Sequence, residues 1–92
     1  LYTQPLTFRV DDLSIIAQAM DKVASTPPTE LAGSPVAKVE KFAQGSKFFT
    51  DNDDRVIVRP SGTEPKLKCY LESPDADRLD AIAADLRAYF GI

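Results

Sequence analysis

The sequence predicts an α+β domain with two layers, in which two helices flank a mainly antiparallel sheet of four strands. Three observations lead to this prediction. Apolar residues recur with a helical period near both ends of the chain, short β-rich runs lie between them, and turn residues separate these runs. The chain has 92 residues, enough for one domain with one core. Residues 1–9 are interpreted as a leading segment or linker, and residues 10–92 as the domain itself.

The first helix is predicted over residues 11–25. Asp11 or Asp12 can cap its N-terminus. The helix should end before Pro27, because the residue ahead of a proline avoids the α region. One face of this helix is apolar and is assigned to the core; its residues are Leu13, Ile16, Met20 and Val23.

Four strands are predicted after a proline-rich loop over residues 26–35. They span residues 36–42, 47–50, 55–59 and 67–71. In the last of them the side chains alternate, so that Leu67, Cys69 and Leu71 share an apolar face and Lys66, Lys68, Tyr70 and Glu72 share a polar one.

The acidic turn at residues 51–54 could be read as the start of a calcium-binding loop. An EF-hand loop starting there would need glycine at its sixth position and glutamate at its end, but the sequence has Val56 and Gly62. We therefore predict no metal site, and interpret the turn as short polar side chains that bond their own backbone.

The second helix is predicted to start at Ser73, with that residue as the cap and Pro74 in the first helical position. Gly91 is a natural stop. The buried stripe of this helix is predicted to consist of Leu79, Ile82, Leu86 and Tyr89.

Composition excludes several classes of function. The net charge of −3 disfavours nucleic-acid and membrane-surface binding, which need an excess of Lys and Arg. The chain has no His, which excludes a Ser-His-Asp triad, a Cys-His dyad and Cys/His zinc sites within it. The lone Cys69 fits a reducing cytoplasm and is interpreted as a small apolar residue inside a strand.

The most distinctive stretch is Arg59-Pro60-Ser61-Gly62-Thr63-Glu64-Pro65-Lys66, a loop between two predicted strands. Its residues suit an oxyanion. Arg59 offers a planar fork, Ser61 and Thr63 offer O–H donors, and Gly62 allows close backbone approach and a positive φ. From residue 55 to residue 68 the local charge is +3 in a chain of net charge −3. The residues alone leave two interpretations open, an anion-binding loop and a plain structural turn.

This loop, followed by Leu67-Lys68-Cys69-Tyr70-Leu71-Glu72, resembles the phosphate-binding loop of the α-D-phosphohexomutases, a family that includes phosphoglucomutase and phosphomannomutase. In that family the loop lies in the fourth, C-terminal domain, whose fold is related to the TATA-box-binding protein. The resemblance implies that Arg59, Ser61, Gly62, Thr63 and Lys68 bind the substrate phosphate. Lys66 is left open, and Glu64 is expected to organise the loop by accepting backbone N–H bonds.

The resemblance also implies a role in an isomerase that moves a phosphoryl group between the 1- and 6-positions of a hexose. This domain would hold the phosphate that is not reacting, on glucose or mannose 1- or 6-phosphate or the 1,6-bisphosphate. The family's active-serine loop and its Asp-rich Mg²⁺ loop are not in this sequence, so the other domains would supply catalysis and metal, and the isolated chain is expected to be inactive. No cofactor, nucleic-acid or membrane partner is expected for the chain itself. Two alternatives stay open: a phosphoglucosamine mutase domain, and a stand-alone anion-binding or interaction module.

Overall fold

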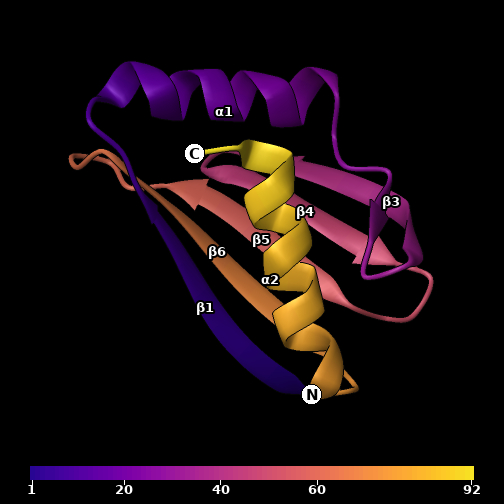
Figure 1. Cartoon of the computed structure of the whole chain (residues 1–92). Helices are drawn as coiled ribbons and strands as arrows, with labels where there is room; N and C mark the ends of the chain where they lie inside the picture. The colour runs from indigo at the N-terminus through magenta and orange to yellow at the C-terminus, as the bar shows by residue number, and fades with distance from the viewer.

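The computed structural model describes all residues from Leu1 to Ile92 and shows one antiparallel sheet covered by two helices (Figure 1). The elements in chain order are β1 (Tyr2–Arg9), α1 (Leu13–Ser25), β2 (Glu30–Leu31), β3 (Ser34–Phe42), β4 (Gly45–Thr50), β5 (Arg55–Pro60), β6 (Lys66–Ser73) and α2 (Asp77–Phe90). The strands lie in the order β1-β6-β5-β4-β3-β2. The predicted α+β class and antiparallel sheet are confirmed.

The sheet has six strands rather than the four expected. One addition is β1, in the segment interpreted as a linker, which pairs with β6 from Tyr2–Ser73 to Arg9–Lys66. Pro5 obscured this strand in the sequence, because proline lacks a ladder donor; it is tolerated here since β1 lies at the edge of the sheet. The other addition is β2, which is only two residues long and lies inside the expected loop.

A tight turn explains how β2 forms. Leu31 pairs with Ser34, so Ala32 and Gly33 make a two-residue hairpin turn, and their φ angles are 52° and 78°. Two positive φ values in succession match the primed turn that suits the twist of a hairpin. Two side chains of α2 (Asp77–Phe90) hold Ala32 in this unusual conformation. The N–H of Ala32 donates to Asp85 Oδ2 at 2.7 Å, and its carbonyl accepts from Arg78 Nη1 at 3.1 Å.

Helix α1 largely follows its sequence pattern. Asp12 is the cap, with Oδ1 accepting from the N–H of Ser14 at 2.8 Å. Ile16, Ala19 and Val23 are buried, and Met20 packs against the core from a partly buried position. Leu13 is 55% exposed, so the apolar stripe begins one turn later than predicted.

Helix α2 starts later than predicted. Ser73 is the buried last residue of β6 and lies four residues before the helix; its hydroxyl donates to Asp54 Oδ1 at 2.6 Å and accepts from the N–H of Asp75 at 3.1 Å. Ala76, in the N-cap position, makes no side-chain capping bond. Asp75 Oδ1 instead accepts from the N–H of Asp77, the first residue of α2, at 3.0 Å. The predicted stop at Gly91 is confirmed, with φ 65° at the C-cap.

The core lies between the helices and one face of the sheet. Alternate strand residues point into it, including the predicted Leu67, Cys69 and Leu71, and α2 contributes Leu79, Ile82 and Leu86. Phe90 closes one end by an edge-to-face contact with Phe8, whose ring centroid is 5.3 Å away. Burial raises the pKa of the Cys69 thiol to about 12, so this residue is a protonated packing group. Neither helix is long and apolar enough to cross a membrane.

Candidate functional site

The β5–β6 loop closes on itself through backbone hydrogen bonds. The N–H of Ser61 donates to the carbonyl of Lys66 at 3.0 Å, and the N–H of Lys66 donates to the carbonyl of Glu64 at 2.7 Å. A third bond, from the N–H of Val10 to the carbonyl of Pro65 at 3.0 Å, ties the loop to the residue that follows β1. The loop therefore lies at the end of the sheet where β1 leaves for α1 (Figure 1).

The structure places the predicted site residues on this loop and the two strands beside it. Arg59 is exposed near the end of β5, and its Nη2 donates to Gln44 Oε1 at 2.8 Å. Lys68 is exposed on β6 and lies directly opposite Arg59 in the strand register. Ser61 is half-buried, while Gly62 and Thr63 are exposed.

Gly62 differs from its expectation in one respect. Its φ is not in the left-handed region, so the loop does not use the positive φ that glycine permits. A Cβ added there would meet no atom within 4 Å. The space around its backbone is therefore open, and that is the property relevant to an approaching anion.

The charges on the open face of the sheet follow two different rules. Away from the loop, opposite charges face each other across strands: Arg55 pairs with Glu72, and Lys47 pairs with Glu40. Beside the loop, like charges face each other, because Arg59 lies opposite Lys68 and Arg9 lies opposite Lys66. Like charges directly opposite are destabilising in a sheet. This end of the sheet therefore carries an uncompensated positive charge.

We call Arg9, Arg59, Lys66 and Lys68 the basic cluster. Only Lys66 makes an ion pair, with its Nζ 2.7 Å from Glu64 Oε2. The hydrogen bond and charge of Lys66 hold the pKa of Glu64 below its ordinary value, and the charges of Arg9 and Lys68 act in the same direction. Glu64 was expected to accept backbone N–H bonds; its side chain instead pairs with the Lys66 ammonium, which makes a charge-assisted hydrogen bond.

A second polar cluster was not foreseen from the sequence. Asp54, in the acidic turn, has 0% of its surface exposed and is the centre of a network. Its carboxylate accepts from Arg78 Nη2 at 2.7 Å, Thr50 Oγ1 at 2.8 Å and Ser73 Oγ at 2.6 Å. This network joins the β4–β5 turn, the end of β6 and α2, so its role is structural. Nowhere in the chain are three or more His, Cys, Asp or Glu side chains grouped to hold a metal.

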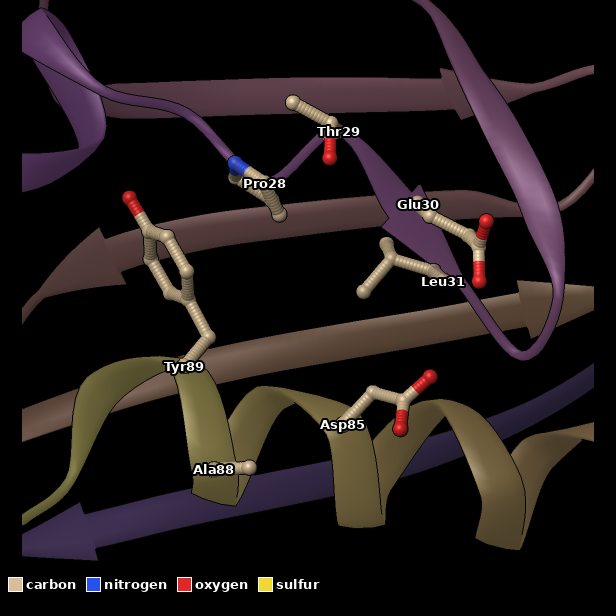
Figure 2. Close-up of a pocket in the computed structure, with 7 residues that line it drawn as sticks. All are labelled: Pro28, Thr29, Glu30, Leu31, Asp85, Ala88 and Tyr89. Atoms are coloured by element: carbon tan, nitrogen blue, oxygen red, sulfur yellow. The ribbon is translucent and has the colours of Figure 1, made fainter.

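The largest cavity lies away from the loop, between β2 and α2 (Figure 2). It measures about 420 Å³ and is lined by Pro28, Thr29, Glu30, Leu31, Asp85, Ala88 and Tyr89. Its two charged residues are both acidic, which would repel a phosphate. The cavity is thus a poor anion site, and the chemistry points back to the loop.

Comparison with known proteins shows which family the chain is related to. Residues 6–88 match the family described as "Phosphoglucomutase/phosphomannomutase, C-terminal domain". The chain belongs to this family. The resemblance to the phosphohexomutases, first seen in the loop, is therefore confirmed for the chain as a whole. The family's named members are mutases, so the chain is a domain of an enzyme family.

Three relatives show the breadth of the phosphohexomutase family. A probable phosphomannomutase of Haemophilus influenzae is 40% identical over 82 residues, which cover 83% of this chain and 17% of that protein. A phosphoglucomutase of Staphylococcus epidermidis is 33% identical over 87 residues, which cover 74% of this chain and 16% of that protein. A phosphoglucosamine mutase of Anaeromyxobacter dehalogenans is 44% identical over 69 residues, which cover 71% of this chain and 14% of that protein. The chain therefore spans only about a sixth of the length of these relatives.

Proposed function

We propose that this phosphohexomutase domain binds the non-reacting phosphate of a hexose phosphate while other domains of the parent enzyme transfer a phosphoryl group between positions 1 and 6. The observation that carries the proposal is the like-charge pair of Arg59 and Lys68 beside a loop that presents Ser61, Gly62 and Thr63. A bound phosphate would neutralise that pair, and Arg59 could offer it two parallel N–H donors.

Binding at a distance from the reacting atoms still contributes to catalysis. Contacts to the remote phosphate can position the reacting end of the sugar and reduce the entropy lost in reaching the transition state. For the substrate we favour glucose or mannose phosphates. The relative named phosphoglucosamine mutase, at 44% identity, supports an amino-sugar phosphate as the second candidate. These sugars differ at carbon 2, so the phosphate group itself is the same in all of them.

Catalysis and Mg²⁺ belong, in this proposal, to other domains. The loop's acidic residue is Glu64. It offers a single carboxylate, which is paired with Lys66, so we assign no Mg²⁺ to this loop. We also propose a cytoplasmic location, which the reduced, buried Cys69 supports.

We expect the isolated chain to have no mutase activity, because phosphoryl transfer needs a nucleophile and charge neutralisation at the reacting phosphate. A coupled assay that follows conversion of glucose 1-phosphate to glucose 6-phosphate, with glucose 1,6-bisphosphate and Mg²⁺ present, tests this. Turnover above the buffer blank by the purified chain would contradict the expectation.

Arg59→Ala is expected to weaken binding of glucose 1,6-bisphosphate at least tenfold, because it removes the charged fork from the loop. For the unchanged chain we expect a dissociation constant of about 1 mM, since a few hydrogen bonds must offset the lost freedom of the ligand. The measurement is a titration of the ¹⁵N-labelled chain, followed through the amide signals of Ser61, Gly62 and Thr63.

Arg55→Ala is the matched control for this titration. Arg55 is exposed on the same strand but lies opposite Glu72, away from the loop. Glucose serves as the uncharged ligand control. Equal weakening in both variants, or saturable shifts with glucose, would mean that the loop is not a phosphate site and would favour a structural turn or a module with a different partner.

A further inference from the structure

Arg9 is a candidate site residue that the loop sequence does not reveal. It is the last residue of β1, is exposed, and lies directly opposite Lys66. It makes no ion pair in the structure. The hydrogen bond from Val10 to Pro65 fixes this end of β1 against the loop, so Arg9 has a defined position relative to it.

The strand order gives the basic cluster a simple geometry. β6, which carries Lys66 and Lys68, lies between β5 with Arg59 and β1 with Arg9. Neighbouring strands are about 4.8 Å apart, so each arginine starts about one strand spacing from the lysine opposite it, Arg9 from Lys66 and Arg59 from Lys68. An anion held above the start of β6 would therefore have a guanidinium on either side, within the reach of long side chains.

Glu64 supplies a second, independent observation. This carboxylate reaches back from the loop to Lys66, and its side chain is 58% exposed. It is the acidic group that lies among the cluster's charges, and its exposure leaves it free to move into solvent when another anion arrives. The free chain thus already holds an anionic group against Lys66 of the basic cluster.

We propose that Arg9 is a further phosphate-binding residue, and that Glu64 is an internal counterion that the phosphate displaces from Lys66. This inference rests on the proposed function, because it concerns the same phosphate. It extends the proposed phosphate site from the β5–β6 loop to β1, which is distant from the loop in sequence. It also makes Glu64 a competitor of the phosphate.

The test is a titration of the ¹⁵N-labelled chain with glucose 6-phosphate at low salt. Arg9→Gln is expected to raise the dissociation constant about three- to tenfold, since a partly exposed charge-assisted contact is lost. Arg9→Lys, which keeps the charge but not the fork, should recover part of this loss. Glu64→Gln should lower the dissociation constant about two- to threefold, because the competing carboxylate charge is gone.

Arg55→Gln is the matched control, because it makes the same change of net charge on the same face of the sheet. It should change binding less than twofold. If Arg9→Gln matches this control, or if Glu64→Gln binds more weakly than the unchanged chain, the inference is wrong. The proposed loop site still stands in that case, provided that Arg59→Ala weakens binding at least tenfold. If the unchanged chain shows no saturable shifts, the proposed function fails and this inference fails with it.

Discussion

Asp54→Asn is expected to lower the free energy of unfolding by about 3 kcal/mol or more at neutral pH. The reason is that the carboxylate, with 0% of its surface exposed, is the partner of the Arg78 guanidinium and of two hydroxyl donors. The variant leaves a largely buried positive charge without its counterion and turns an acceptor into a donor where donors already converge. Urea unfolding followed by circular dichroism measures the loss.

The same network predicts a pH dependence. Burial raises the pKa of Asp54, but hydrogen bonds from Arg78, Ser73 and other donors outweigh that effect and lower it from 3.8 to about 2. A carboxyl whose pKa is lower in the folded state stabilises the fold fully above its unfolded pKa. That contribution, about 2 kcal/mol, is lost as the pH falls from 5 through 2.

Asp51→Asn is the control for both effects. Asp51 lies in the same turn, is exposed, and makes no side-chain hydrogen bond, so its replacement should change stability by less than about 0.5 kcal/mol. The free energy of unfolding of Asp54→Asn is compared with that of the unchanged chain at each pH. The gap between the two values should narrow by about 1 kcal/mol as the pH falls from 6 to 3. Stability curves that run parallel over this range would show that the Asp54 charge does not stabilise the fold.

The elements that could be predicted from the sequence are those that depend on local signals. The cap at Asp12, the stop at Gly91 and the alternating β6 strand all follow from neighbouring residues. β1 could not be foreseen, because its pattern is weak around Pro5 and its partner β6 is more than 50 residues away in sequence. β2 depends on a hydrogen bond that Ala32 donates to Asp85 and one that it accepts from Arg78, and both exist only in the folded chain.

The same distinction applies to the candidate site. The β5–β6 loop could be found because its residues are contiguous. Arg9 could not, since only the register between β1 and β6 brings it beside Lys66. Asp54 was misleading for a different reason: an aspartate in a run of acidic turn residues has the pattern of a solvated side chain, and its burial depends on Arg78 from α2.

Gly45→Ala is expected to destabilise the chain by about 2 kcal/mol or more, because it places a side chain where there is no room. A Cβ on Gly45 would overlap the backbone carbonyl oxygen of Val58 and would lie 3.1 Å from the Cα of Arg59. Those atoms cannot move aside easily, since β5 is paired on both sides, with β4 and with β6. The start of β4 would have to separate from β5.

This separation should also reach the candidate site. Gln44, next to Gly45, accepts the hydrogen bond from Arg59 Nη2, so displacement of β4 would release the guanidinium that the proposal assigns to phosphate. The amide signals of Arg59 and its neighbours should therefore shift, and phosphate binding should weaken together with stability.

Gly62→Ala is the matched control for Gly45→Ala, because the same change is made where an added Cβ meets nothing within 4 Å and φ is not left-handed. It should change the free energy of unfolding by less than about 0.5 kcal/mol. With a slope of about 1 kcal/mol per molar urea for a chain of this size, the Gly45 variant should unfold about 2 M earlier than the control. Equal midpoints would mean that β4 and β5 accommodate the methyl group by a small shift, and that Gly45 is not what allows the two strands to approach closely beside Arg59. Unequal midpoints would show that Gly45, unlike Gly62, is needed to build the strand pair that carries Arg59.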